Sequence, residues 1–275
     1  MIEIPESRTI ACQICQTLRG RTLTGVFAAT HPHRFTWWAG DPHAYPALLT
    51  GRRIVSAAGC GAFVILELDD DTRLALSDGV NLRLCVEQAA VPNRYQLLLT
   101  LDDGRFLVVT VAMYGGILAF KGRLDNPYLQ GAVEKPSPLD EAFDADHFER
   151  LRADSRANHS VKAFLATEQR IPGLGNGVLQ DILFRAGIHP KRKMNTLGDA
   201  AFENLFRVLK SLLAEMTRLG GRDTEKDLFG NTGGYRVLLS KNTWSSPCPR
   251  CGCAIVREAY LGGTVYFCPA CQPFE

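Results

Sequence analysis

Cys248-Pro-Arg-Cys251 and Cys268-Pro-Ala-Cys271 form two Cys-x-x-Cys pairs close to the end of the chain. Each pair presents two thiolates from a tight turn, and two such turns that face each other complete a tetrahedral zinc site. Residues 254–256 and 264–267 are predicted strands joined at Gly262-Gly263, so the metal is expected to hold a β-hairpin. Because four thiolates leave no open coordination position, one structural Zn²⁺ is predicted rather than a catalytic one; a disulfide pair or buried free cysteines are the alternatives.

The charge and cysteine content of the whole chain narrow the class of protein. The 275 residues carry a formal net charge of +2, so any phosphate-binding surface must come from local clustering of the 31 Lys and Arg. We find no signal peptide and no apolar run near the roughly 18 residues of a transmembrane helix, which predicts a cytoplasmic protein with no membrane partner. The other cysteines are then expected to be reduced: Cys12, Cys15, Cys60, Cys85 and Cys253.

The first half of the chain is predicted to be rich in β-strands. A helix over residues 7–18 precedes short runs of Val, Ile, Leu, Phe and Thr, which turns such as Asp102-Asp103-Gly104 separate. This pattern is typical of an antiparallel sandwich or barrel. The predicted strands are residues 22–28, 34–38, 53–57, 63–68, 73–76, 96–101, 106–111 and 117–121.

The second half has a helical pattern, with helices predicted over 146–153, 161–168 and 177–186 and a long one after Thr196 that ends at Gly220. The change from a β-rich to a helical pattern, together with the cysteine pairs, divides the chain into four parts. The parts are an N-terminal β-domain (1–133), a Pro-containing linker (134–140), a helical domain (141–240) and a zinc finger (241–275).

One turn of the helical domain stands out as a candidate ligand site. The glycines of Ile171-Pro-Gly-Leu-Gly-Asn176, including Gly175, allow close approach of a ligand to the backbone. Asn176 is predicted to cap the next helix, whose free amides with the Asn side chain form an anion site, and Lys162 adds a cation. An ordinary turn between two helices is the alternative interpretation.

The order of these parts resembles the formamidopyrimidine-DNA glycosylase and endonuclease VIII family. The resemblance rests on the opening Glu3-x-Pro-Glu6, Lys162, the segment 171–190, Gly220-Gly221-Arg-Asp-Thr224 and the four-cysteine finger. It implies an α+β multidomain fold with an N-terminal β-sandwich flanked by helices, a helix-two-turn-helix domain and a C-terminal β-hairpin zinc finger. It also implies that DNA binds between the halves, where Lys162 and Asn176 contact the phosphates that flank a damaged nucleotide rotated out of the duplex.

The family's catalytic proline has no counterpart in this sequence. In the family the initiator Met is removed and the exposed Pro amine attacks the sugar C1′ to form a Schiff base, while the next residue, a Glu, moves protons. Here Ile2 stands in place of Pro and is expected to block removal of Met1, whereas Glu3 is present. Either Glu3 activates water, or the free α-amine of Met1, which keeps a useful neutral fraction at physiological pH, replaces the Pro amine. Glu3 is alternatively a residue stabilised at a helix N-terminus.

The residues that open the DNA in this family also differ here. Leu76 is a candidate apolar wedge, with a core residue as the alternative, and Met113 or Tyr114 are candidates for intercalation. The Arg that enters the base stack has no match, and the finger turn around Gly262-Gly263 lacks the Arg that holds the phosphate at the lesion. Each lost cation removes a phosphate contact.

These observations predict a DNA repair glycosylase, a hydrolase of the N-glycosidic bond with doubtful lyase activity. We expect an intracellular, nucleoid-associated monomer that acts on damaged duplex DNA or on DNA that is already single-stranded, bulged or cross-linked. A catalytically inactive protein that recognises DNA damage or structure is the alternative, and an interaction scaffold is the third class. Residues 222–235, rich in Gly, Asp and Asn, are expected to face the lesion.

The segment with His31, His33, Trp37 and Trp38 fits none of these assignments. Two histidines two residues apart can share a metal, but without nearby carboxylates or thiolates a surface loop is the simpler interpretation. If the loop meets DNA, Trp37 or Trp38 can stack on an extruded base.

Overall fold

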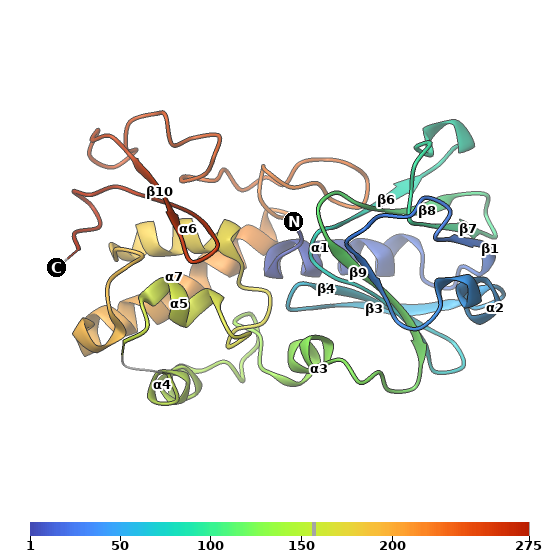
Figure 1. The fold of residues 1–275 in the computed structure, drawn as a ribbon, viewed down its shortest axis with the longest axis horizontal. Helices are drawn as coiled ribbons and strands as arrows, with labels where there is room; N and C mark the ends of the chain where they lie inside the picture. The colour runs from blue at the N-terminus through green and yellow to red at the C-terminus, as the bar shows by residue number, and fades with distance from the viewer. Residues whose placement is uncertain (156–157, 275) are drawn as a thin grey trace.

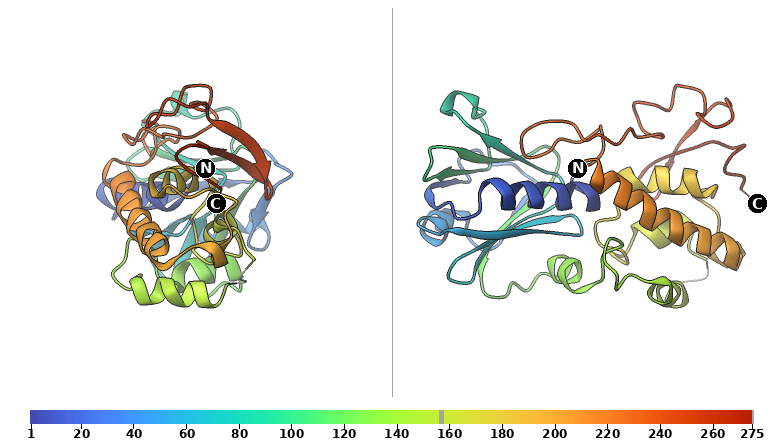
Figure 2. Two further views of the ribbon diagram at one scale, coloured as in Figure 1. Left: turned by 90° about the vertical axis from the view of Figure 1, so that its left-hand side faces the viewer. Right: turned by 180° about the vertical axis from the view of Figure 1, so that it is seen from behind.

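The computed structural model describes residues 1–155 and 158–274. A β-rich half and a helical half lie end to end, and the N-terminus of the chain lies where the two halves meet (Figure 1; Figure 2, right). The predicted fold class is confirmed: a β-sandwich with flanking helices, a helical region and a β-hairpin with four close cysteines. Within the described residues, no helix has both the length and the apolar character needed to cross a membrane.

The β-rich half is a sandwich of two sheets. One sheet has the strand order β1-β7-β8-β6 and the other the order β2-β9-β5-β4-β3, in which β2 and β9 run parallel. Side chains from both sheets meet in one apolar core together with Ile10 and Ile14 of helix α1. The strands are β1 (Leu23–Ala28), β2 (Thr36–Trp38), β3 (Ile54–Cys60), β4 (Phe63–Leu68), β5 (Thr72–Leu76), β6 (Val80–Cys85), β7 (Leu97–Leu101), β8 (Phe106–Val111) and β9 (Gly115–Lys121).

Strand β6 is absent from the sequence-based prediction. Its buried residues Val80, Leu82 and Leu84 alternate with the exposed Asn81 and Arg83, which is the period of a half-buried strand. The alternation is visible in the sequence, so hydrophobic periodicity alone is sufficient to predict this strand. Pairing of β6 with β8 makes it one wall of the site described below.

Helices cover the sandwich and build the second half. Four aromatic side chains, Phe143, Phe148, Phe164 and Phe202, form the centre of the helical core. The longest helix is two residues shorter at its start than expected, since it begins at Asp199 rather than directly after Thr196. The helices are α1 (Ile4–Thr17), α2 (Tyr45–Leu49), α3 (Pro127–Glu134), α4 (Ala145–Ala153), α5 (Val161–Ala166), α6 (Asn176–Ala186) and α7 (Asp199–Arg218), with short 3₁₀ turns at Pro42–Ala44, Gln88–Ala90 and Met194–Thr196.

The C-terminal hairpin consists of β10 (Val256–Tyr260) and β11 (Gly263–Phe267). Its turn is Leu261-Gly262, one residue earlier than predicted, because both residues have left-handed φ values of 49° and 71° that suit a tight hairpin turn. Gln180 of α6 accepts a hydrogen bond from the Tyr266 amide at 3.1 Å and donates one to the Thr264 carbonyl at 3.0 Å. These bonds hold the hairpin against α6.

Candidate active site

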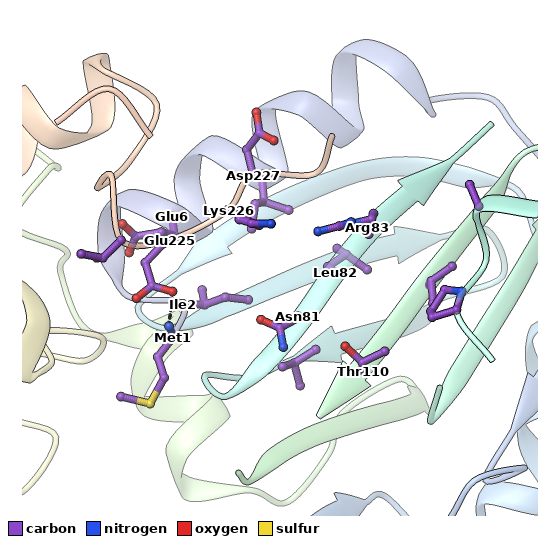
Figure 3. A pocket seen from close by; sticks show the side chains of 16 residues that line it. Met1, Ile2, Glu6, Asn81, Leu82, Arg83, Thr110, Glu225, Lys226 and Asp227 are labelled. Carbon is purple, nitrogen blue, oxygen red and sulfur yellow. Dashed lines mark hydrogen bonds and ion pairs between the residues drawn. The ribbon is translucent and has the colours of Figure 1, made fainter. Parts of the chain in front are cut away.

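A cavity of about 510 Å³ opens beside the N-terminus of the chain (Figure 3). Met1 and Ile2 form one end, β6 and β8 contribute Asn81, Arg83 and Thr110, and the segment after α7 closes the side opposite the strands. The α-amine of Met1 forms an ion pair with the Glu225 carboxylate, drawn as a dashed line in Figure 3. A primary amine therefore lies at the edge of a cavity large enough for a nucleobase.

Residues 222–235, expected to face a lesion, extend from the helical half across the sandwich. Leu228 is fully buried in the sandwich core, and its carbonyl accepts a hydrogen bond from the Leu84 amide at 2.8 Å. Gln13 of α1 donates to the Asp227 carboxylate at 2.9 Å. The segment is thus fixed at several points and forms one wall of the cavity, although contact with a lesion stays a prediction.

Glu3 is not among the residues that line the cavity, so its carboxylate is not placed to activate a water molecule there. Its carboxylate accepts hydrogen bonds from the amides of Gly177 and Val178 at 2.9 and 2.8 Å, so it caps the N-terminus of α6. The Glu3 side chain is only 4% exposed, and burial raises its pKa. The alternative interpretation of Glu3 as a helix N-terminal residue agrees with this position, and the helix it stabilises lies in the other half of the protein.

The predicted role of Asn176 as a helix cap is wrong. The residue at the cap position of α6 is Gly175, and the Asn176 amide instead donates to the carbonyl of Thr264 at 2.8 Å. The amides predicted to bind an external anion already bind the Glu3 carboxylate. Gly175 is needed at this point because a Cβ atom there would lie 2.5 Å from a Glu3 carboxylate oxygen.

Arg222 lies between two buried acids, an arrangement that the sequence analysis does not predict. Its Nε and Nη2 donate to the two carboxylate oxygens of Glu6 at 2.9 and 2.8 Å, and its Nη1 lies 3.5 Å from Glu3. Nη2 also donates to the Met1 carbonyl at 3.1 Å. Burial alone would raise the pKa of Glu6, but the charge and hydrogen bonds of Arg222 outweigh it and hold that pKa below its usual value. The sequence does contain one signal for this arrangement: Glu3 and Glu6 stand at the start of an apolar helix, and two buried carboxylates need a cation nearby.

Lys162 and Asn176 lie together under the tip of the hairpin. Lys162 Nζ donates to the Tyr260 carbonyl at 2.6 Å, and burial lowers the pKa of Lys162. A Cβ atom built on Gly263 would lie 3.5 Å from Lys162 Nζ and 3.6 Å from Asn176 Nδ2. The buried Asn176 Oδ1 has no hydrogen-bond partner within the described part of the chain. Lys162 and Asn176, the two residues predicted to contact phosphates, are therefore neighbours at the hairpin tip, whereas phosphate binding itself stays a prediction.

The three candidate DNA-inserting residues have different environments. Leu76 is fully buried in the sandwich core, so its role as an apolar wedge is excluded and the alternative of a core residue holds. Met113 is 62% exposed in the turn between β8 and β9. Tyr114 follows it, with its hydroxyl 3.4 Å from the sulfur of Met1. Met113 is thus exposed and Tyr114 contacts Met1 at the end of the cavity, whereas insertion of either side chain into DNA stays a prediction.

The four cysteines of the two Cys-x-x-Cys pairs converge as predicted. Their sulfur atoms all lie within 4.8 Å of one another, with Cys248 and Cys271 3.8 Å apart and Cys251 and Cys268 3.4 Å apart. Four thiols at these separations form a suitable donor set for one soft, tetrahedral metal ion.

The β-sandwich, the glycine-rich turn between two helices and the four-cysteine hairpin are the parts that the resemblance implies. Comparison with known proteins gives the family. Residues 135–227 match the family described as "Formamidopyrimidine-DNA glycosylase H2TH domain". The formamidopyrimidine-DNA glycosylase of Alkalilimnicola ehrlichii is 31% identical over 284 residues, covering 99% of this chain and all of that protein, and that of Nocardioides sp. is 30% identical over 283 residues, covering 99% and 95%. The chain belongs to the formamidopyrimidine-DNA glycosylase family.

Solved structures agree with this assignment. The MutM (Fpg) protein of Thermus thermophilus superposes with a TM-score of 0.82 at 28% identity, over 98% of both chains. Lactococcus lactis Fpg, in a complex with DNA that contains an abasic site, superposes with a TM-score of 0.82 at 26% identity, over 98% of this chain and 99% of that one. The departures at Ile2 and in the finger turn around Gly262-Gly263 therefore occur within a shared architecture.

Proposed function

We propose that this protein is a DNA repair glycosylase that binds a damaged nucleotide rotated out of DNA, with its base in the cavity beside Met1. Membership of the family and the likeness to a protein bound to damaged DNA support the substrate class. The observation that carries the proposal is the position of the cavity, which lies where the two halves meet and contains a primary amine at its edge. Such a protein acts on cellular DNA, which agrees with the expected location at the nucleoid.

Met1, rather than Glu3, is the group best placed to react. The α-amine lines the cavity, whereas both oxygens of the Glu3 carboxylate accept hydrogen bonds from α6. In the proposed step the lone pair of the neutral amine forms a bond to C1′, the bond from C1′ to the base breaks, and the base leaves with the bonding electrons and takes up a proton. Glu225, the ion-pair partner of the amine, accepts the proton that the amine must lose before it attacks.

Glu3 then acts as a positioning residue. Its carboxylate joins the start of α1 to the start of α6, and this contact fixes Met1 relative to the helical half. Arg222 strengthens the same junction through its hydrogen bonds to Glu6 and to the Met1 carbonyl. The position of the amine therefore depends on contacts between residues distant in sequence.

We also propose that Lys162 and Asn176 contact the DNA backbone at the tip of the hairpin. Both lie within 3.6 Å of the Cβ position at Gly263, where the absence of a side chain leaves room for a phosphate oxygen. The four cysteines are proposed to hold one structural Zn²⁺, which would stabilise the hairpin and so keep its tip over the two residues.

Borohydride trapping tests the proposed reaction. The protein is incubated with DNA that carries an abasic site, whose open-chain C1′ aldehyde condenses with the α-amine to an imine with loss of water. Borohydride reduces the imine to a stable secondary amine, and the adduct is mapped by mass spectrometry after the N-terminus has been confirmed as Met1. An adduct on the α-amine is expected, together with release of an oxidised base from a lesion-containing strand. Glu3→Gln serves as a comparison and should keep the adduct on Met1. Tight DNA binding with neither base release nor an adduct would refute the proposal and would favour the inactive, damage-binding alternative.

A further inference from the structure

An exposed group of aromatic and apolar side chains lies next to the cavity and has no role in the reaction proposed above. Trp37 of β2 is 55% exposed, Phe35 is 48% exposed and Met113 is 62% exposed. The neighbouring Trp38 points the other way, with its ring 5.3 Å from that of Tyr45, which is buried. Trp37 is thus the outward-facing member of the pair, as the alternation along a strand requires.

The group is held together by the parallel pairing of β2 with β9. Trp37 is the register partner of Gly116, and the Gly115 amide donates to the Phe35 carbonyl at 3.0 Å. This pairing brings the ring of Trp37 to a centroid distance of 5.9 Å from the ring of Tyr114, with an angle of 52° between them. The two rings come from segments distant in sequence and form one surface.

This surface adjoins the reactive end of the cavity. The Tyr114 hydroxyl lies 3.4 Å from the sulfur of Met1, whose amine is the proposed nucleophile. A nucleotide whose sugar reaches the amine therefore has a neighbour on the same strand close to Tyr114 and Trp37.

The chemistry around the rings indicates a nucleobase as the occupant. The Arg34 guanidinium lies 5.2 Å from the centroid of the Phe35 ring, so a cation borders the aromatic surface. Aromatic faces flanked by a cation are the combination that binds single-stranded nucleic acid, because bases stack on the rings while the cation attracts the backbone. The place in the sequence where the family has a stack-entering Arg is here occupied by Met113 and Tyr114.

We propose that Trp37 and Tyr114 form a stacking platform for an unpaired base next to the reacting nucleotide, so that single-stranded or bulged DNA is the preferred substrate. The proposal rests on the proposed function, because it assumes that the DNA strand passes Met1. It assigns Trp37 a role that the resemblance did not imply. A base that is already unstacked does not have to be displaced from a duplex, which removes the need for a wedge Arg.

The test compares the binding of one labelled oligonucleotide of mixed sequence, about 15 nucleotides long, as a single strand and as a fully paired duplex. The wild-type protein should bind the single strand more tightly. Trp37→Ala should weaken single-strand binding by about 5-fold or more, the effect of losing one stacked base, and should change duplex binding by less than about 2-fold. Trp37→Phe, which keeps an aromatic face, should retain most of the affinity.

Phe27→Ala is the matched control, because Phe27 is also 48% exposed but lies on β1 in the other sheet. It should leave both affinities unchanged. Three results would each overturn the platform. Trp37→Ala could lose equal affinity for the single strand and the duplex, it could lose affinity for neither, or the wild-type protein could bind the duplex more tightly. Base release by the same preparations is measured separately: a wild-type protein that prefers single strands through Trp37 but releases no base would refute the proposed function and leave the platform standing.

Discussion

Replacing Arg222 with methionine removes the cation that lies between Glu3 and Glu6 while it keeps much of the buried side-chain volume. Arg222 and the two carboxylates are each no more than 4% exposed. Glu3 keeps its hydrogen bonds from two α6 amides, but Glu6 loses the donors Nε and Nη2, so Glu6 bears most of the cost. Removing one partner of a buried ion pair destabilises a protein by about 3–5 kcal/mol, and we expect a loss in this range near pH 7.

The loss should depend on pH in a defined direction. In the wild type the pKa of Glu6 is held below its ordinary value of 4.5, so its ion pair contributes stability above that pH and loses it as the pH falls. Without Arg222, burial raises the pKa of Glu6 above 4.5, and the buried charge then costs free energy at neutral pH that protonation relieves as the pH falls. The difference between wild type and Arg222→Met should therefore be largest near pH 7 and clearly smaller near pH 5.

Urea unfolding at the two pH values measures this difference. Arg222→Met combined with Glu6→Gln should recover part of the loss, because the uncompensated charge is gone. Arg123→Met is the surface control: Arg123 is 79% exposed and 3.7 Å from Glu134, and its replacement should change stability by about 0.5 kcal/mol or less. A loss below about 1 kcal/mol for Arg222→Met, or an equal loss at both pH values, would refute the reasoning.

Four further predictions follow from the site. Cys251→Ser should abolish stoichiometric zinc binding and loosen the hairpin, measured by metal analysis and limited proteolysis; retained zinc would contradict the assignment. Lys162→Ala should weaken binding to all DNA sequences alike and reduce the salt slope by about one, and a loss that depends on base identity would argue against a phosphate contact. Glu225→Gln should lower the yield of trapped adduct without lowering DNA affinity; an unchanged yield would remove Glu225 as proton acceptor. Gly175→Ala should destabilise the protein by about 1–3 kcal/mol in thermal unfolding, because the added Cβ would lie 2.5 Å from the Glu3 carboxylate. If the variant is as stable as the wild type, the Glu3 side chain can move to make room for the methyl group and the contact is not rigid.

Local patterns in the sequence were sufficient for the elements that depend on neighbouring residues. The spacing of Cys248, Cys251, Cys268 and Cys271 predicted the convergence of four sulfur atoms, because a Cys-x-x-Cys turn fixes its two thiols. Apolar periodicity gave most strands and helices, and strand β6 was missed although its alternation is visible. The turn at 171–176 was recognised, but its capping residue was not, since an Asn beside a helix start has other partners within reach.

The sequence by itself determined the fold class, the cysteine set and the departure at Ile2, because these depend on composition, spacing and position in the chain. Only the tertiary structure decided which groups act on one another. It turned Glu3 toward a helix 174 residues away, placed Arg222 between Glu3 and Glu6, buried Leu76 and brought Trp37 against Tyr114. Such pairings depend on how the two halves and the two sheets pack. The partner of a buried charge or of an exposed ring lies far away in the sequence, so local sequence patterns cannot identify it.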